Sequence, residues 1–179
     1  ASKIGADKIA ESFCRSFEMP VVIARPFNTY GPRQSARAVI PTIVTQLLND
    51  KKGIQLGSLS PTRDLNYVSD ICNGLIALAE CDGAIGREIN IGSGTEISIN
   101  DLANQIIDIM GVDVSVISDE NRVRPENSEV ERLVCDSGLL RQLTGWKPEI
   151  MIKEGLVKTI EWFKDENNLK KYKSEIYNI

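Results

Sequence analysis

Apolar positions in the first part of the chain follow the period of a helix and then merge into a continuous run. The spacing in the first segment predicts a helix over 2–17. The apolar side chains that recur at this spacing are Ile4, Ile9, Phe13 and Phe17. A β-branched run at 19–25 then predicts a buried strand. The chain therefore opens with a helix followed by a strand.

The same alternation continues along the rest of the chain. Helices are predicted over 38–50, 70–81, 101–110, 137–146 and 152–168, with a helical tail from 169. Strands are predicted over 54–58, late in 60–70, within 86–94, over 112–118 and over 132–136. Capping is expected from Ser69 or Asp70, from SIND at 98–101, and from Gly145 at a helix end. This alternation is typical of the α/β class.

The predicted strands are too few for a complete doubly wound domain. Because parallel strands need long crossover connections, we interpret the first strand as the end of a larger sheet. The later, smaller elements indicate an appended subdomain. The chain also begins inside an amphipathic helix, with no capping residue before it. We therefore expect it to be part of a longer protein.

Composition and charge exclude several classes of function. Apolar residues make up 42% and charged residues 26%, as in ordinary globular proteins, and the net charge of -4 argues against nucleic-acid binding through bulk charge. No apolar run approaches the roughly 20 residues that cross a bilayer. Histidine is absent, so a histidine-based triad is excluded within this chain, and no metal site is expected. The separated cysteines, with no CxxC pair, favour free thiols in a reducing cytosol: Cys14, Cys72, Cys81 and Cys135.

The loop RPFNTYGPRQS at 25–35 follows the first predicted strand and suits neither helix nor strand. Its prolines, glycine and asparagine are turn residues. Its position beyond the carboxyl end of a strand is also where ligands bind in open α/β sheets. Asn28 can both donate and accept hydrogen bonds, which suits a pyrophosphate oxygen or a sugar hydroxyl. The residues alone leave the turn and the ligand shelf both open.

Two arginines on separate loops are candidates for binding a diphosphate. Arg63 lies in TRD before an apolar strand, and Arg124 lies in VRPE. A guanidinium suits bidentate contact with phosphate. The alternatives are that Arg63 pairs with neighbouring Asp64 and that Arg124 is a solvated charge. Glu129 is expected to face solvent or to orient an arginine.

A series of motifs in fixed order resembles a known family. RPFNTYGPR, VIP, RDLNYVSD, NIGSG, RPE and LTGWKPE occur in the order found in the C-terminal half of extended short-chain dehydrogenases/reductases that act on nucleotide sugars. Over essentially all 179 residues the chain looks most like the NAD-dependent 4,6-dehydratases of the legionaminic-acid branch, which use GDP-linked N-acetylglucosamine. The resemblance implies the C-terminal part of a Rossmann-like fold with a small α/β substrate-binding subdomain. Residues 1–58 would end the Rossmann-like core and start the substrate region, and 59–179 would be mainly the subdomain with returning core elements.

The same resemblance implies a role for each matching residue. Lys3 matches the lysine of the family's Tyr-x-x-x-Lys motif, which lowers the pKa of the tyrosine and holds the nicotinamide ribose of NAD. Phe27 matches a position near the nicotinamide, although a core aromatic is an equal alternative. The implied nucleotide-sugar contacts are Asn28, Arg37, Ala38, Val39, Arg63, Asn90 and Arg124. For Asn90, a turn residue at a strand end is the alternative.

The resemblance also implies an activity. In a 4,6-dehydratase, hydride moves from C4 of the sugar to NAD, water leaves across C5 and C6, and the hydride returns to C6, giving a 4-keto-6-deoxy sugar. The tyrosine, the glycine-rich NAD loop and the acid/base pair would lie upstream of Ala1, so we expect this chain alone to be inactive. The alternatives are a 4-epimerase of the same family and a nucleotide-sugar-binding fragment without catalysis. The implied partner is a second copy, docked through the first helix, in the cytoplasm, with no nucleic acid and no membrane.

Overall fold

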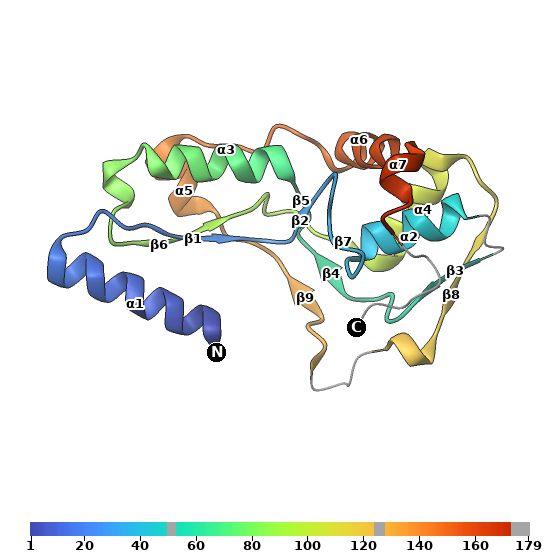
Figure 1. The fold of residues 1–179 in the computed structure, drawn as a ribbon, viewed down its shortest axis with the longest axis horizontal. Helices are drawn as coiled ribbons and strands as arrows, with labels where there is room; N and C mark the ends of the chain where they lie inside the picture. The colour runs from blue at the N-terminus through green and yellow to red at the C-terminus, as the bar shows by residue number, and fades with distance from the viewer. Residues whose placement is uncertain (50–52, 124–127, 173–179) are drawn as a thin grey trace.

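The structure is a computed structural model that describes residues 1–49, 53–123 and 128–172. It has two lobes joined by short strands (Figure 1). In the first lobe, β1 (Ile23–Pro26) and β6 (Glu88–Ile91) form a parallel pair, with α1 (Ser2–Phe17) on one side of the pair in Figure 1 and α3 (Val68–Ala79) and α5 (Gly138–Thr144) on the other. The core of this lobe is formed by the buried side chains of Ile71, Leu78, Ala84, Ile89, Ile91, Leu140 and Trp146.

The second lobe is built on another parallel pair, β3 (Gly53–Leu56) with β8 (Ser115–Ser118). Helices α2 (Val39–Leu48), α4 (Ile99–Met110), α6 (Ile152–Lys164) and α7 (Glu166–Leu169) gather around it (Figure 1). Its core includes Ile40, Ile43, Val44, Ile54, Leu102, Ile106, Leu156, Ile160 and Phe163, all almost completely buried. Helices α2, α4 and α6 each turn an apolar face to this core, as the helical spacing of their apolar residues requires.

Short strands join the two lobes. β2 (Thr29–Tyr30) pairs in parallel with β5 (Asn66–Tyr67). β4 (Thr62–Arg63) lies between antiparallel β7 (Ile97–Ser98) and parallel β9 (Arg132–Leu133). Among the described residues, 3-10 turns also form at η1 (Asp82–Ala84) and η2 (Glu120–Arg122).

A buried carboxylate fastens this junction. Asp64 is fully buried, and its two oxygens accept hydrogen bonds from the Ser93 hydroxyl at 2.6 Å, the Gly94 amide at 2.9 Å and the Cys135 amide at 3.1 Å. The side-chain amide of Asn66 donates to it as well, at 3.0 Å. Asp64 thus connects the end of β4 to the glycine turn after β6 and to the segment after β9. The expected alternative of an Arg63–Asp64 pair is wrong, since Asp64 is bound by these neutral donors.

Most predicted elements are confirmed with shifted ends, and one cap is wrong. Ser98 caps α4 by accepting from the Asp101 amide, and Gly145 ends α5 in the left-handed region with φ of 71°, both as predicted. Helix α3, however, begins at Val68 after Tyr67, with no side-chain cap. Asp70 is instead buried and accepts from the backbone amides at 149 and 150.

The predicted helix over 152–168 is divided in two. Asp165 is extended, with φ of -68° and ψ of 118°, so α6 ends before it and α7 begins after it, with the Asp165 side chain accepting from the Asn167 amide. Most of the predicted helical tail lies outside the described residues. The predicted boundary at residue 58 stays a prediction.

Candidate functional site

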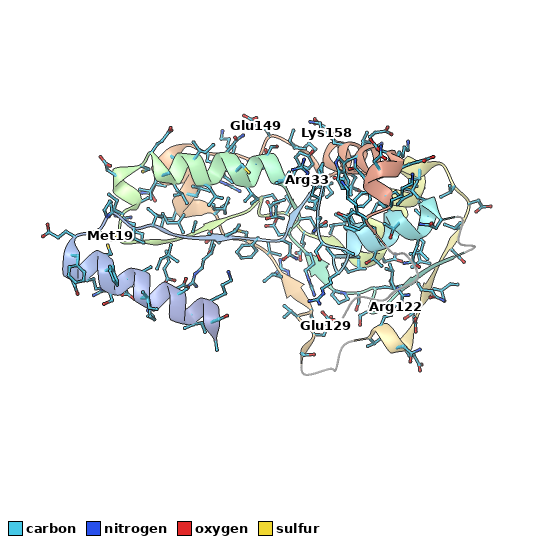
Figure 2. The ribbon with its side chains drawn as sticks, in the orientation of Figure 1. Met19, Arg33, Arg122, Glu129, Glu149 and Lys158 are labelled. Atoms are coloured by element: carbon cyan, nitrogen blue, oxygen red, sulfur yellow. The ribbon has the colours of Figure 1, made fainter. Side chains whose placement is uncertain are left out.

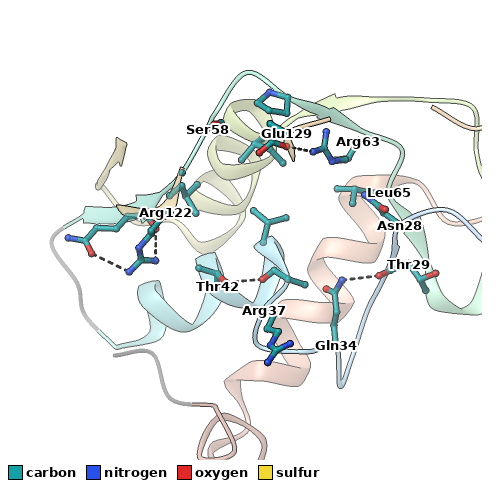
Figure 3. A pocket seen from close by; sticks show the side chains of 17 residues that line it. Asn28, Thr29, Gln34, Arg37, Thr42, Ser58, Arg63, Leu65, Arg122 and Glu129 are labelled. Atoms are coloured by element: carbon teal, nitrogen blue, oxygen red, sulfur yellow. Dashed lines mark hydrogen bonds and ion pairs between the residues drawn. The ribbon is translucent and has the colours of Figure 1, made fainter. Parts of the chain in front are cut away.

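A cavity of about 440 Å³ lies where the ends of several elements meet beside the second lobe (Figure 3). It is lined by the loop 28–39, the start of α2, the segment after β3, β4, the start of α4, and the charged loop before β9. The lining side chains are Asn28, Thr29, Gln34, Arg37, Ala38, Val39, Thr42, Gln55, Leu56, Gly57, Ser58, Pro61, Arg63, Leu65, Ile99, Arg122 and Glu129. Cations, amides and hydroxyls thus share one concave surface with apolar side chains, a mixture typical of ligand sites.

The backbone of the RPFNTYGPRQS loop is fixed by both strand pairs. Phe27 donates its amide to the Ile91 carbonyl at 2.9 Å, and the Asn28 carbonyl accepts from the Asn66 amide at 2.8 Å. The side-chain amide of Asn28 makes no hydrogen bond with the residues that the structure describes, so it is available to a ligand. The turn and the shelf predicted for this loop are therefore compatible: the backbone makes the turn while Asn28 lines the cavity.

Arg63 lies in the cavity wall with one end of its guanidinium already bound. Its Nη1 donates to the Val130 carbonyl at 2.6 Å and to the Thr62 carbonyl at 2.8 Å, and its Nη2 is 2.8 Å from Oε1 of Glu129 (Figure 3). The Arg63 and Glu129 side chains are 13% and 14% exposed. Nε and the second Nη2 hydrogen have no partner among the described residues. That edge of the guanidinium has the geometry for two bonds to one phosphate.

Two further arginines line the cavity in different states. Arg37 is exposed, and its guanidinium has no hydrogen bond or ion pair within the described parts of the chain. Arg122 is held: its Nε donates to Asp119 at 3.1 Å and its Nη1 to the Gln55 carbonyl at 3.0 Å (Figure 3). Hydrogen bonds from the Asn121 amide and from Arg122 lower the pKa of the Asp119 carboxyl. Arg37 therefore offers a cation that can reorient, and Arg122 one that is fixed.

The cavity collects some of the predicted site residues and not others. Those that line it are Asn28, Arg37, Ala38, Val39 and Arg63. Lys3 lies exposed on the first turn of α1, in the other lobe (Figure 1). Phe27 and Asn90 are half-buried at the ends of β1 and β6, and the Asn90 amide donates weakly to the Asp136 carbonyl at 3.4 Å. Arg124 lies outside the described residues. The roles of all these residues stay predictions.

Sequence reasoning missed part of the cavity wall. Arg122 lies two residues before Arg124, and the run DENRVRPE gives no reason to predict one arginine at the site and not the other. Glu129 was expected to face solvent or orient an arginine, and the structure places it on Arg63. Gln34 lies within the predicted loop and Thr42 in the helix after it, and only their shared position at the cavity could have indicated them.

Comparison with known proteins decides the family. Residues 1–159 match the family described as GDP-mannose 4,6 dehydratase. The chain belongs to this family. The predicted resemblance to nucleotide-sugar-modifying extended short-chain dehydrogenases/reductases is confirmed, and so is the α/β fold class.

Relatives of this GDP-mannose 4,6 dehydratase family member include dehydratases and reductases. This chain is 33% identical over 170 residues to a dTDP-D-glucose 4,6-dehydratase from Homo sapiens, and the match covers 92% of this chain and 47% of the relative. It is also 33% identical over 156 residues to a GDP-6-deoxy-D-mannose reductase from Pseudomonas aeruginosa, covering 82% and 50%. The chain thus spans about half the length of these relatives.

Solved structures of similar proteins have the same fold. An epimerase from Methanothermobacter thermautotrophicus superposes with a TM-score of 0.86 at 31% identity, covering 96% of this chain and 51% of that one. A dTDP-glucose 4,6-dehydratase from Bacillus anthracis, crystallised with NAD, gives 0.75 at 26% identity, covering 90% and 50%. In the described part of this family member, no helix is long and apolar enough to cross a membrane.

Proposed function

We propose that this chain is the substrate-binding portion of an NAD-dependent nucleotide-sugar 4,6-dehydratase, with a GDP-linked N-acetylglucosamine type of substrate. The observation that carries the proposal is the cavity in which the Asn28 amide, without a hydrogen-bond partner among the described residues, shares a wall with Arg37 and Arg63. A nucleotide sugar combines a diphosphate with sugar hydroxyls, and these groups need cations and amides at one site.

The lining residues suit separate parts of such a substrate. The open Nε–Nη2 edge of Arg63 binds a phosphate, and Arg37 approaches the same diphosphate from the loop before α2. The Asn28 amide bonds a sugar hydroxyl or a bridging oxygen. The backbone and side chains of Ala38 and Val39 cover the ligand. Asn90 and Arg124 contribute from the neighbouring segments in this proposal.

The proposed cofactor is NAD, and Lys3 and Phe27 are the residues of this chain assigned to it. When bound, NAD would supply the acceptor for hydride from the sugar. Neither residue lines the described cavity, and Lys3 is exposed on α1. The described residues of this chain do not by themselves form a cofactor site. What this chain supplies is the binding and orientation of the sugar nucleotide.

A 4-epimerase of the same family is the second candidate. Its support is that relatives and structural neighbours include epimerases, among them a UDP-glucuronic acid 4-epimerase from Bacillus cereus crystallised with UDP-glucuronic acid and NAD, with a TM-score of 0.81 at 26% identity. Incubating the native full-length protein with NAD and GDP-linked N-acetylglucosamine distinguishes the two. A product lighter by one water, with a 4-keto group, supports the dehydratase. A product of unchanged mass with inverted C4 overturns it.

The proposed assembly is a homodimer through α1, in the cytoplasm. α1 carries no buried residue, and the side chains of Ile4, Ile9 and Phe17 are 66%, 64% and 70% exposed. Ile9, Phe13 and Phe17 recur every four residues, so they share one exposed apolar face of α1, as is typical of an interaction surface. The cysteines form no disulfide among the described residues, which suits a reducing compartment.

A further inference from the structure

The loop that lines the cavity is also held from behind by the C-terminal end of the described chain. The Tyr172 hydroxyl donates to the Gln34 carbonyl at 2.8 Å, across 138 residues of sequence. The Tyr172 ring packs edge-on against Phe163, with centroids 4.8 Å apart, and against Trp162 at 6.1 Å. Burial raises the pKa of Tyr172, so its hydroxyl remains a donor at neutral pH. The tyrosine is therefore anchored in the core of the second lobe and reaches out to the loop.

The opposite side of the same loop forms the wall of the site. Gln34 donates its side-chain amide to the Thr29 carbonyl at 2.8 Å and lines the cavity, and Arg37 follows three residues later (Figure 3). Just before Gln34, Arg33 has φ of 66°, in the left-handed region that non-glycine residues rarely adopt. Such a conformation persists only when surrounding contacts impose it. The loop is thus held in a conformation that its own sequence does not favour.

A second hollow lies behind the loop, between it and the C-terminal residues of the described chain, with a volume of about 350 Å³. Arg33, which lines this hollow, is labelled in Figure 2. The hollow is lined by Arg33, Gln34, Ser35, Ala36, Trp162, Lys171 and Tyr172. Among the described residues, the Tyr172 hydroxyl makes the hydrogen bond that crosses from these helices to the loop 31–38. If that bond is lost, the loop can relax into the hollow and carry Gln34 and Arg37 with it.

We propose that Tyr172 is a positioning residue for nucleotide-sugar binding. Its hydroxyl holds the 31–38 loop against the cavity, so that Gln34 and Arg37 are in place before the ligand arrives. A preorganised loop avoids the loss of conformational freedom that binding would otherwise cause. The identity of the ligand rests on the proposed function above, but the hydrogen bond and its effect on the loop do not.

Tyr172→Phe tests this proposal because it removes the hydroxyl and keeps the packed ring. We expect backbone amides in the 31–38 loop to exchange hydrogen about 3- to 10-fold faster without ligand, since one neutral hydrogen bond is lost. GDP-linked N-acetylglucosamine should bind a similar factor more weakly to the native full-length protein, with KM raised and kcat unchanged. Tyr30→Phe is the matched control: it removes a hydroxyl bond to the Ile152 carbonyl at 3.2 Å and leaves the loop tether intact.

The outcomes separate the proposal from the proposed function. Faster exchange in the loop for Tyr172→Phe, and not for Tyr30→Phe, together with weaker binding, supports the positioning role. Unchanged exchange and unchanged affinity overturn it. If the unsubstituted protein binds none of GDP-, UDP- and dTDP-linked sugars, the proposed function fails, while the exchange measurement still decides whether Tyr172 holds the loop.

Discussion

Arg63 donates from Nη2 to the Glu129 carboxylate 66 residues later, at 2.8 Å, and this ion pair forms part of the cavity wall. With two carbonyls on Nη1, the pair fixes the plane of the guanidinium, and within the described parts of the chain Nε has no hydrogen-bond partner. A charged group in this arrangement binds phosphate without first having to be ordered.

Arg63→Lys should weaken binding of a nucleotide diphosphate sugar by roughly 10-fold or more, because an ammonium cannot make the paired bonds of the guanidinium edge. The measurement is calorimetric titration. Arg132→Lys is the matched control, since Arg132 is paired with Glu96, just before β7, but its side chain is 71% exposed and outside the cavity. Equal affinities for both variants would remove Arg63 from the site.

Asn28→Ala should weaken binding of the sugar nucleotide by about 5- to 10-fold, the effect of one lost hydrogen bond to a polar ligand. The backbone is held at the Asn28 carbonyl by the Asn66 amide, so the loop should keep its shape. Affinity for the nucleoside diphosphate without its sugar separates two roles. If this affinity falls equally, Asn28 contacts the diphosphate; if it is unchanged, Asn28 contacts the sugar.

Asp64→Asn should lower the free energy of unfolding by about 3 kcal/mol. One oxygen of the buried carboxylate accepts from the Gly94 and Cys135 amides and the other from the Ser93 hydroxyl. The side-chain nitrogen of the substituted Asn replaces one of these oxygens, and in either place it faces hydrogen-bond donors from which it cannot accept. Urea denaturation measures the change. Asp101→Asn on the exposed first turn of α4 is the comparison, expected to cost about 1 kcal/mol or less. A loss for Asp64→Asn no larger than this would show that the junction does not depend on the carboxylate.

Cys135 should resist alkylation in the folded protein. Burial, reinforced by the nearby charges of Asp64 and Asp136, raises the pKa of its thiol to about 12, so almost no thiolate forms at pH 8. Cys72 is exposed on α3 and should react first with iodoacetamide. Mass spectrometry of the peptides measures the order, and urea should make the two cysteines react alike. Early modification of Cys135 would contradict the buried environment.

Phe17→Glu should convert a dimer of the native protein into a monomer, because it places a charge on the most exposed aromatic of the α1 face. Sedimentation velocity measures the oligomeric state. Met151→Glu is the control, since Met151 is 75% exposed but lies at the start of α6 in the other lobe. A dimer that survives Phe17→Glu, or a monomer before any substitution, would exclude α1 as the interface.

The long elements could be predicted because periodicity encodes them. Helix α1 was placed from four apolar residues, and α4 from its SIND cap and aliphatic face. The two-residue strands β2, β4 and β7 have no periodicity of their own and were not predicted, since they exist only through partners far along the chain. Strands were predicted late in 60–70 and over 132–136, where β5 and β9 form, but not with their short bounds. A two-residue pairing is set by the fold and not by its local sequence.

The candidate site was predictable where a residue's own chemistry indicates its role, as for Asn28 and Arg63. It was not predictable where the role depends on a distant partner. Nothing local in the sequence indicates that Glu129 will lie on Arg63 or that Tyr172 will reach Gln34. Asp64 and Asp70 show the same limit. Pairing with Arg63 was the alternative expected for Asp64, and helix capping was expected for Asp70. Both are instead buried and accept hydrogen bonds from backbone amides of remote segments.

The parallel pair of β1 and β6 has a further consequence for how this protein can be handled. Only one edge of β1 is occupied by β6 among the residues described, and two parallel strands are rarely stable without further neighbours. Within the described residues the second edge of β1 has no strand partner, so its backbone donors and acceptors can pair with another strand. We therefore expect a separately produced polypeptide that carries a matching strand to dock there, and expressing the two pieces together and isolating the complex tests this.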